Sequence, residues 1–499
     1  MAVQKLEHLR LPKYQRFGIS LGNFFASIPH AIVAVIFAIG RFFRSLGEGI
    51  ANLFRNIILT WKNGDYKTRI SYFVLGFGNI ARGQVLRGVL FLLFEVLFIV
   101  YMVCFGGQYL ANIGTLGTQE AVYDPDWGTL ITPADNSFNI LLFGVLSIFF
   151  IVAFLVTWYF NIMQNKVAQE IIATGKPLKS GKQDLNSLVD DQFHKTLLSL
   201  PLLGILVFTV MPIFFMILIA FTNYDYNHMA PNNLFTWVGV ENFANILNIG
   251  GNKFANTFSE TLVWTLVWAF FATFTNYFLG MVVAMIINKK GIKLKKLWRT
   301  VLVVSIAVPQ FISLLYVGKM FGRNGLVNSI LLDTLHWIEK PLPFWEDAMW
   351  SRITVILVNI WIGIPYLMLI TSGILMNIPS DLYESARIDG ASPVKMYFKI
   401  TLPYMLFVTG PYLLSSFIGN MNNFNVIFLL NGGQPEDQSL QKAGHTDLLI
   451  TWLYKLTVSA EPDYKMASVI GIMVFIVVSL ISVIVYNVIP SMKNEEDFQ

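Results

Sequence analysis

Long apolar stretches alternate with polar loops along most of this chain. Eight of the stretches stay apolar over about twenty residues or more, the length that an α-helix needs to cross the hydrocarbon core of a bilayer. They cover residues 85–104, 139–158, 197–221, 262–287, 301–321, 353–376, 404–424 and 468–489. The pattern predicts an all-α, polytopic membrane protein with eight transmembrane helices, because a helix satisfies its own backbone inside lipid.

The charges of the loops predict the orientation of the chain. Residues 288–300 carry six Lys or Arg and residues 164–196 carry five Lys, which places both loops in the cytoplasm. Residues 106–136 carry four acidic residues and no Lys or Arg, which places this loop outside. When the eight stretches are threaded through these loops, both termini and the polar segment 383–403 are expected in the cytoplasm.

The N-terminal region 1–84 contains one further apolar segment, residues 18–40. A ninth span here would move the basic N-terminus outside, and the segment that follows is too short to return. Arg41, Arg44 and Arg55 lie among aromatic and aliphatic residues. We therefore predict a cytoplasmic region whose amphipathic helix lies at the interface and contacts membrane lipid.

The composition agrees with a membrane protein and argues against several other classes. The chain is 55% hydrophobic and 13% charged, whereas soluble domains carry roughly 25% charged residues. The net charge of +5 comes from loops beside the spans, so it does not indicate nucleic-acid binding. The lone Cys104 rules out a disulfide within the chain, and the six histidines join no acidic cluster with catalytic or metal-ligand spacing. The glycines between Gly175 and Lys182 do not match a phosphate-binding loop.

Two of the apolar stretches carry a polar stripe on one helical face. The stripes consist of Asn359, Gly363 and Tyr366 in the sixth stretch, and of Ser416, Gly419, Asn420 and Asn423 in the seventh. Amides that face lipid would leave hydrogen bonds unmade, so these faces are expected to meet protein or a cavity. Amides and hydroxyls suit a sugar, whose hydroxyls they can bond. The same residues also hold helices together, and the stripes alone leave both interpretations open.

Other polar or helix-breaking residues within the stretches have simpler interpretations. Pro309 and Pro365 are each expected to kink a helix. Glu95 is expected to play a structural part away from the transport pathway. A cluster of acids across several stretches would have indicated an ion-coupled secondary carrier, and the sequence has none.

The polar segment 383–403 reads YESARIDGASPVKMYFKITLP. Its spacing predicts a helix, a glycine turn, a short helix and a proline at the entry to the next span. The residues of interest are Glu384, Ser385, Ala386, Asp389, Gly390, Ile400, Leu402 and Pro403. The segment resembles the coupling loop of binding-protein-dependent ABC importers and departs from it at Ser385, where that family has alanine.

Four further segments, 238–243, 358–366, 416–424 and 443–449, resemble the larger membrane subunit of maltose/maltodextrin importers. The similarity runs from Leu197 to the C-terminus. It implies a six-helix ABC permease core at 197–490, with the coupling loop at 379–403. Residues 85–196 would then form two accessory helices and their loops, and residues 491–499 a cytoplasmic tail.

The resemblance also implies which residues form a transmembrane sugar site. These are Asn359, Ile362, Gly363, Tyr366, Ser416, Asn420 and Asn423. Gly419 stands where the enterobacterial relative has a phenylalanine that contacts sugar, which removes one stacking contact and widens the site.

The function implied is that of a permease subunit of an ATP-driven importer of maltose or maltodextrin in the cytoplasmic membrane. Its expected partners are a second permease, an ATPase dimer that uses ATP and magnesium, and an extracytoplasmic sugar-binding protein. We expect no cofactor, metal or catalytic residue of its own. The short outside loop 222–260 resembles importers of Gram-positive bacteria, whose binding protein is lipid-anchored. An importer of galactosides or raffinose-type sugars remains an alternative, and an ion-coupled carrier or a membrane enzyme is disfavoured.

Overall fold

The computed structural model describes residues 13–289 and 291–488, with side chains at 40–289, 291–486, Val33 and Phe37. The contacts between Cα atoms divide the chain into two units. Among the described residues, one comprises 13–36, 243–289, 291–460 and 469–488, and the other 37–242 and 461–468. Three helices, α2, α11 and α23, contribute residues to both units.

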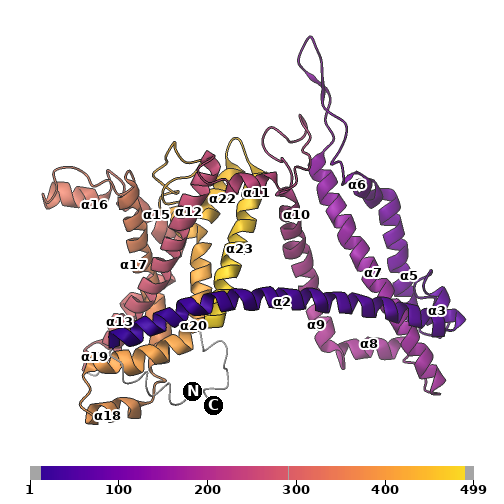
Figure 1. Ribbon diagram of the computed structural model, residues 1–499, viewed down its shortest axis with the longest axis horizontal. Helices are drawn as coiled ribbons and strands as arrows, with labels where there is room; N and C mark the ends of the chain where they lie inside the picture. The colour runs from indigo at the N-terminus through magenta and orange to yellow at the C-terminus, as the bar shows by residue number, and fades with distance from the viewer. Residues whose placement is uncertain (1–12, 290, 489–499) are drawn as a thin grey trace. The chain divides into compact units, whose positions relative to one another are not determined.

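The unit built on residues 37–242 is helical, apart from one hairpin (Figure 1). Its elements are α2 (Lys13–Asn63), α3 (Tyr66–Ile70), α4 (Phe77–Ile80), α5 (Val85–Tyr101), the π-helical turn η1 (Met102–Gly106), α6 (Gly107–Asn112), β1 (Val122–Tyr123), β2 (Leu130–Thr132), α7 (Ser137–Ala173), α8 (Gly181–Val189), α9 (Phe193–Ile205), η2 (Leu206–Val210) and α10 (Met211–Ile219). The antiparallel strands β1 and β2 pair Val122 with Thr132. They lie in the acidic loop that was expected outside.

The other unit contains the helices from α11 onward. Its elements are α11 (Glu241–Leu247), α12 (Lys253–Phe270), η3 (Phe271–Thr275), α13 (Asn276–Asn288), α14 (Lys295–Ala307), α15 (Gln310–Met320), α16 (Leu326–Ser329), η4 (Ile330–Thr334), α17 (Ala348–Leu375), α18 (Ser380–Ile388), α19 (Pro393–Met396), η5 (Tyr397–Thr401), α20 (Leu402–Met421), α21 (Phe424–Leu430), α22 (Leu449–Val458) and α23 (Tyr464–Val488).

The prediction of an all-α membrane protein is confirmed. Among the described residues, seven helices are long and apolar enough to cross a membrane, and a bent pair can make an eighth. Each is longer than its apolar stretch, because polar turns extend it at one or both ends. The stretch 139–158, for example, lies within α7, which runs from Ser137 to Ala173.

The fifth expected span is not one continuous helix. It forms α14 and α15, which meet at an angle of 92°. Val308 and Pro309 between them have extended backbone, with ψ of 128° and 124°. Pro309 therefore ends a helix instead of kinking it, whereas α17 continues through Pro365 as one helix.

Each unit has its own buried apolar core. In one, Trp264 and Trp268 of α12 pack with residues of α15, α17 and α21. In the other, Leu141 and Val145 of α7 pack with Ile219 of α10. Glu95 on α5 is buried and its Oε2 accepts a hydrogen bond from the Leu75 backbone at 2.9 Å, as expected for a structural acid.

Candidate functional site: a polar cavity and an exposed loop helix

A polar cavity of about 470 Å³ lies among the helices of the 243–460 unit. Its volume is within the roughly 300–1,000 Å³ of small-ligand sites. It is lined by Ala272, Asn276, Ser305, Ile306, Ala307, Val308, Pro309, Gln310, Ser313, Asn359, Trp361, Ile362, Gly363, Tyr366, Leu367, Tyr412, Ser416, Asn420 and Asn423. Seven of the eight residues proposed for the sugar site from the sequence are among them.

The eighth residue, Gly419, does not line the cavity. A Cβ placed on it would have nothing within 4 Å, so it faces open space rather than a neighbouring helix. Gly419 precedes Asn420 on α20 and lies at the edge of the polar stripe, where a residue without a side chain does not reach the cavity.

The break between α14 and α15 supplies a wall of the cavity that the polar stripes did not reveal. Residues 305–310 run along it, and Ser313 follows one turn into α15. A helix end leaves backbone N–H or C=O groups without intrahelical partners, so such a wall offers backbone as well as side-chain hydrogen bonds. The polar residues Ser305, Gln310 and Ser313 around Pro309 were the sequence feature that could have indicated it.

Asn276 and Gly363 fix the spacing of α13 and α17 at the cavity. A Cβ on Gly363 would overlap the Asn276 carboxamide, so only glycine admits this approach. Asn276 Nδ2 donates to the Ala272 carbonyl at 2.8 Å, while its buried Oδ1 has no partner in the structure. That oxygen belongs to a lining residue, and an unsatisfied buried acceptor is costly unless a ligand or water supplies a donor.

Two amides of the second polar stripe, Asn420 in the last turn of α20 and Asn423 just after it, also join neighbouring helices. Asn420 Nδ2 donates to the Thr273 hydroxyl at 3.0 Å, and Asn423 Nδ2 donates to Asn420 Oδ1 at 3.3 Å. Asn423 Oδ1 also accepts from the Val426 backbone at 3.3 Å, which caps α21. The same amides therefore both join helices and line the cavity.

The chemistry of the lining is neutral and rich in hydrogen-bonding groups. The described lining residues include amides, hydroxyls and the aromatic rings of Trp361, Tyr366 and Tyr412, and none is Asp, Glu, Lys, Arg or His. Aromatic faces and neutral donors and acceptors suit an uncharged, polyhydroxylated ligand better than an ion or a phosphate.

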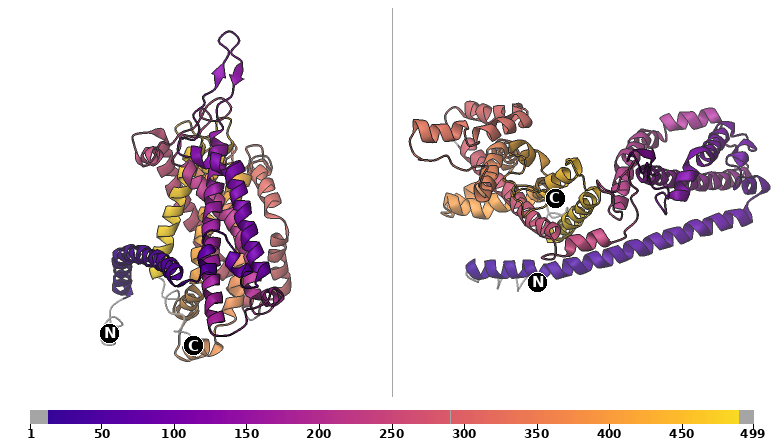
Figure 2. Two further views of the ribbon diagram at one scale, coloured as in Figure 1. Left: turned by 90° about the vertical axis from the view of Figure 1, so that its right-hand side faces the viewer. Right: turned by 90° about the horizontal axis from the view of Figure 1, so that it is seen from above.

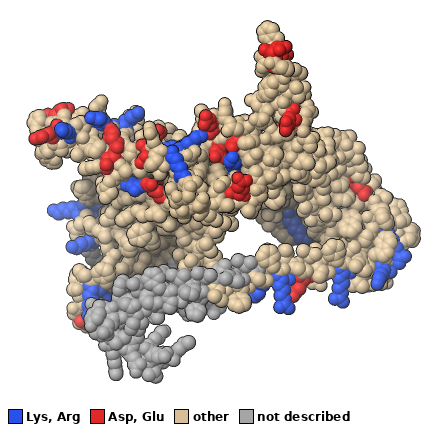
Figure 3. Space-filling model, turned by 45° about the horizontal axis from the view of Figure 1, so that its top comes forward, with Lys and Arg blue, Asp and Glu red and all other residues tan. Residues whose placement is uncertain are grey.

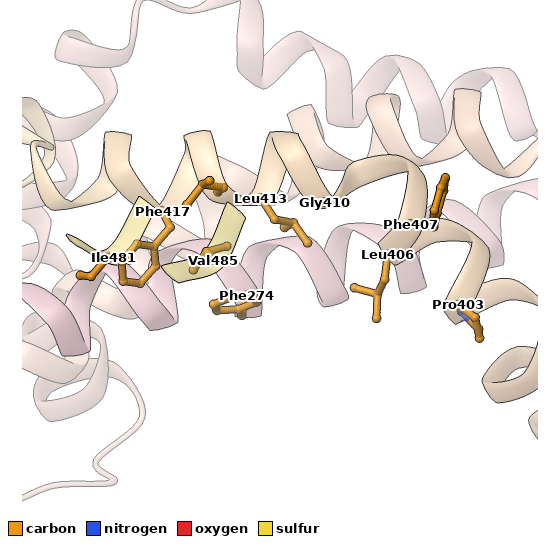
Figure 4. A pocket seen from close by; sticks show the side chains of 10 residues that line it. Phe274, Pro403, Leu406, Phe407, Gly410, Leu413, Phe417, Ile481 and Val485 are labelled. Atoms are coloured by element: carbon orange, nitrogen blue, oxygen red, sulfur yellow. The ribbon is translucent and has the colours of Figure 1, made fainter. Parts of the chain in front are cut away.

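Two larger cavities have a different character. One, of about 570 Å³, runs along α20 from Pro403 to Phe417 and is closed by Phe274, Ile481 and Val485 (Figure 4). The other, of about 710 Å³, lies between α12 and α17 with Glu260 and Arg352 among apolar neighbours. Volume does not single out the polar cavity, and the case for it rests on its hydrogen-bonding groups.

The segment expected to couple to an ATPase has the predicted local structure. Helix α18 ends at Ile388, and Gly390 follows in the left-handed conformation with φ of +71°. Gly390 N donates to the Arg387 carbonyl at 3.0 Å and Ala391 N to the Ala386 carbonyl at 2.9 Å, the two bonds of a Schellman motif. Helix α19, turn η5 and α20 then follow in the predicted order.

Most residues of α18 are exposed, and one hydrogen bond fixes this helix to the start of α20. Glu384, Ser385 and Asp389 are exposed, as is Ile388 at 87% of its surface. The Tyr383 hydroxyl bonds the buried Thr401 hydroxyl at 2.9 Å, which ties α18 to the start of α20. Leu402 packs on the cluster of Tyr277, Met281 and Met405. Of the other predicted residues, Ile400 and Ala386 are partly buried and Pro403 is exposed.

Comparison with known proteins places the chain in a transport family. Residues 276–493 match the family of binding-protein-dependent transport system inner membrane components. A maltodextrin transport system permease protein of Bacillus subtilis is 33% identical over 84% of this chain and 95% of its own length.

Two other relatives match as broadly. A maltodextrin transport system permease protein of Streptococcus pneumoniae is 32% identical over 86% of this chain and 97% of its own length. A galactooligosaccharides transport system permease protein of Bacillus subtilis is 34% identical over 84% and 96%. The chain is a membrane permease subunit and belongs to the family of binding-protein-dependent transport system inner membrane components.

Proposed function

We propose that this chain moves maltodextrin-type oligosaccharides into the cell as one permease subunit of an ATP-driven importer. It would pair with a second, similar permease and with an ATPase dimer that binds ATP and magnesium. An extracytoplasmic binding protein would deliver the sugar to short outside loops, and both termini would lie in the cytoplasm. The similarity to relatives from two Gram-positive bacteria favours the same kind of source.

The observation that carries this proposal is the neutral, polar cavity within a bundle of apolar helices. Its amides, hydroxyls and aromatic rings come from α13, α14, α15, α17, α20 and the residue Asn423 after α20, and they match the hydroxyls and apolar ring faces of a sugar. A cavity walled by several helices opens to one side or the other when those helices move relative to one another. Transport then requires a contact that differs between the two conformations.

The exposed helix α18 is the proposed site of that contact. Glu384–Gly390 would dock in the ATPase, and closure of the ATPase dimer would push on α18. The Tyr383–Thr401 hydrogen bond would pass the displacement to the base of α20, whose other end carries Asn420 at the cavity. The role of this chain is thus mechanical coupling, with no cofactor of its own.

The decisive experiment is uptake of labelled maltotriose into vesicles that contain this chain, the second permease, the ATPase and the binding protein. We expect uptake that requires ATP and is abolished by Glu384→Lys. Uptake without ATP or without the partners would overturn the proposal in favour of a secondary carrier.

Asn359→Ala tests the cavity itself. Loss of one hydrogen bond to sugar costs about 1 kcal/mol, so we expect the apparent affinity for maltotriose in transport to fall about fivefold. Asn425→Ala is the matched control, because this exposed amide lies outside the cavity lining. Equal effects of the two substitutions, or no effect of Asn359→Ala, would show that the polar residues of α17 serve only to pack helices together.

A galacto-oligosaccharide importer is the second candidate, favoured by the similarity to the galactooligosaccharide permease. Competition of labelled maltotriose uptake by unlabelled galactobiose, raffinose and maltodextrins separates the two. Stronger competition by a galactoside would keep the importer and change its substrate.

A further inference from the structure

The part of helix α2 that belongs to the 37–242 unit leaves a wide apolar face uncovered. Phe42, Phe43 and Phe54 expose 62%, 63% and 63% of their surface. The face continues through Leu46, Ile50, Leu53 and Trp61, which are also exposed. These positions recur at intervals of three and four residues, so they form one continuous stripe along the helix.

The opposite face of this part of α2 is basic. It carries Arg41, Arg44, Arg55 and Lys62 against a single acid, Glu48, which pairs with Arg44 at 3.0 Å. Figure 3 shows Lys and Arg spaced along the described part of this helix at the lower right. Polar residues such as Asn52 complete this face.

The end of α2 is held by hydrogen bonds to the segment that follows it, residues 64–84, which we call the elbow. Arg69 Nε donates to the Trp61 carbonyl and Nη2 to the Lys62 carbonyl, both at 3.1 Å, which caps the last turn of α2. The Tyr72 hydroxyl donates to the Ile57 carbonyl at 2.7 Å. The direction of the helix is therefore fixed by several hydrogen bonds.

The elbow is in turn held on the C-terminal part of the membrane-spanning helix α7. Gln169 Nε2 donates to the Asn63 carbonyl at 3.1 Å, and Trp158 Nε1 donates to the Tyr72 carbonyl at 2.9 Å. Arg82, whose side chain is 1% exposed, pairs with Asp65 at 2.5 Å and bonds Asn165 of α7 at 2.6 Å. This network sets the level of α2 relative to the span.

The orientation of α2 relative to the membrane-spanning helices determines whether its apolar face contacts lipid. Within this unit, α2 runs crosswise to α5 and α7 instead of parallel to them, near the level at which α5 begins, while α7 continues below it (Figures 1 and 2). The apolar window of the span Val85–Asn112, which includes α5, is only 6% buried by protein, so most of its surface is free to face lipid. A helix laid across the end of a lipid-facing span lies at the boundary between headgroups and acyl chains.

We propose that residues 40–63 of α2 bind an anionic lipid surface. The stripe of Phe42, Leu46, Ile50, Leu53 and Trp61 enters the acyl boundary. The arginines and Lys62 remain at headgroup level and pair with phosphates of anionic phospholipids. Helices that bind anionic membrane surfaces typically combine basic residues on their polar face with aromatic residues on their apolar face. This inference is independent of the sugar that the permease carries.

The test uses the full-length chain with Cys104→Ser and one new cysteine that carries a polarity-sensitive dye. Ile50→Cys lies in the centre of the apolar face, and Asn52→Cys on the polar face is its control. The protein is placed in nanodiscs of phosphatidylcholine alone or with phosphatidylglycerol. We expect nitroxide-labelled lipid to quench the dye at position 50, and aqueous iodide to quench it at position 52.

The anionic component is tested by Arg41→Gln/Arg44→Gln/Arg55→Gln. Each basic residue contributes about 1 kcal/mol at an anionic surface, so each removal should lower the ratio of docked to undocked helix about fivefold. The loss of lipid quenching at position 50 should appear in phosphatidylglycerol discs and be mimicked by high salt. The matched control Lys176→Gln/Lys179→Gln/Lys182→Gln removes equal charge from exposed positions in the α7–α8 loop and the first turn of α8, and it should retain quenching.

Two results would overturn the proposal. One is equal quenching in both kinds of disc with no effect of the arginine substitutions. The other is a dye at position 50 that remains open to iodide in every lipid and becomes shielded only when the partner subunits are added. That result would assign the face to a protein interface.

Discussion

At residue 363 the absence of a side chain sets the distance between two helices and the width of the cavity. The contact of Gly363 with the Asn276 carboxamide lets α17 lie against α13, and Gly280 one turn further along α13 allows the same approach, since its Cβ would come 2.7 Å from Leu367 Cβ. Small residues at such crossings let helix backbones approach closely in membranes.

Gly363→Ala should therefore destabilise the protein by about 1–3 kcal/mol, because the added methyl group forces the two helices apart. Thermal unfolding of the purified protein in detergent measures the loss. Gly419→Ala on α20 is the control, since its Cβ has open space around it and the melting temperature should not change. A Gly363→Ala protein as stable as the control would show that α13 and α17 can separate at little cost.

Asp65 gives the N-terminal elbow a dependence on pH. Burial works to raise the pKa of Asp65, but hydrogen bonds from Thr68 and the charge of Arg82 outweigh it and hold the pKa below its ordinary value. A carboxylate with a lowered pKa stabilises the fold above its unfolded pKa, and this contribution is lost as pH falls through the folded pKa.

Asp65→Asn should thus be less stable than the parent protein at neutral pH, and the difference should shrink as the pH falls below about 4. Melting curves between pH 3 and 7 measure this difference. A constant difference over that range would mean that Asp65 acts through its shape rather than its charge.

The sequence was a good guide to residues on regular helices and a poor guide to residues at breaks. Asn359 and Asn420 could be predicted because a period of 3.6 residues puts them on polar faces of continuous helices. Ser305 and Gln310 were missed because they reach the cavity through a change of chain direction, which no periodicity reveals. The contact of Asn276 with Gly363 depends on how two helices cross, which the sequence of either helix does not reveal.

At the scale of elements, the segment from α18 to α20 follows from its sequence alone. Each step has a local cause, since Gly390 adopts a positive φ that ends α18, and Pro393 starts α19 after the Ser392 cap. The bend between α14 and α15 could be foreseen only as a kink. A proline breaks the backbone pattern, but the size of the bend depends on what the two halves pack against.

Gly390→Ala places a side chain in the left-handed conformation, at a cost of about 1–2 kcal/mol. We expect the turn after α18 to lose its fixed geometry, so that less sugar is transported for each ATP hydrolysed. Gly373→Ala near the end of α17 is the control, because its Cβ meets nothing and its φ is ordinary. The ratio of maltotriose uptake to ATP hydrolysis measures the effect, and an unchanged ratio in Gly390→Ala would remove the turn from the coupling path.

At the scale of the whole molecule, the charges of the loops predict the orientation in the membrane. The hairpin β1–β2 carries Trp127, which is 82% exposed, in the acidic loop. Lys179 lies in the basic loop between α7 and α8 and is also exposed. The two loops should lie on opposite sides of the bilayer.

The single native cysteine makes this orientation easy to measure. In a Cys104→Ser background, a maleimide that cannot cross membranes should label Trp127→Cys in intact cells. It should label Lys179→Cys only after the cells are permeabilised. The reverse pattern would invert the chain and move α18 away from any cytoplasmic ATPase.

The break between α14 and α15 has a consequence for how such a permease acquires new substrates. Backbone groups at a helix end are the same in every sequence, so hydrogen bonds made there survive amino-acid replacement and accept any suitably placed hydroxyl. If the cavity carries saccharides as proposed, these backbone groups would form its constant part. Selectivity between saccharides would then fall to neighbouring side chains such as Gln310, where single substitutions would change which sugar is carried.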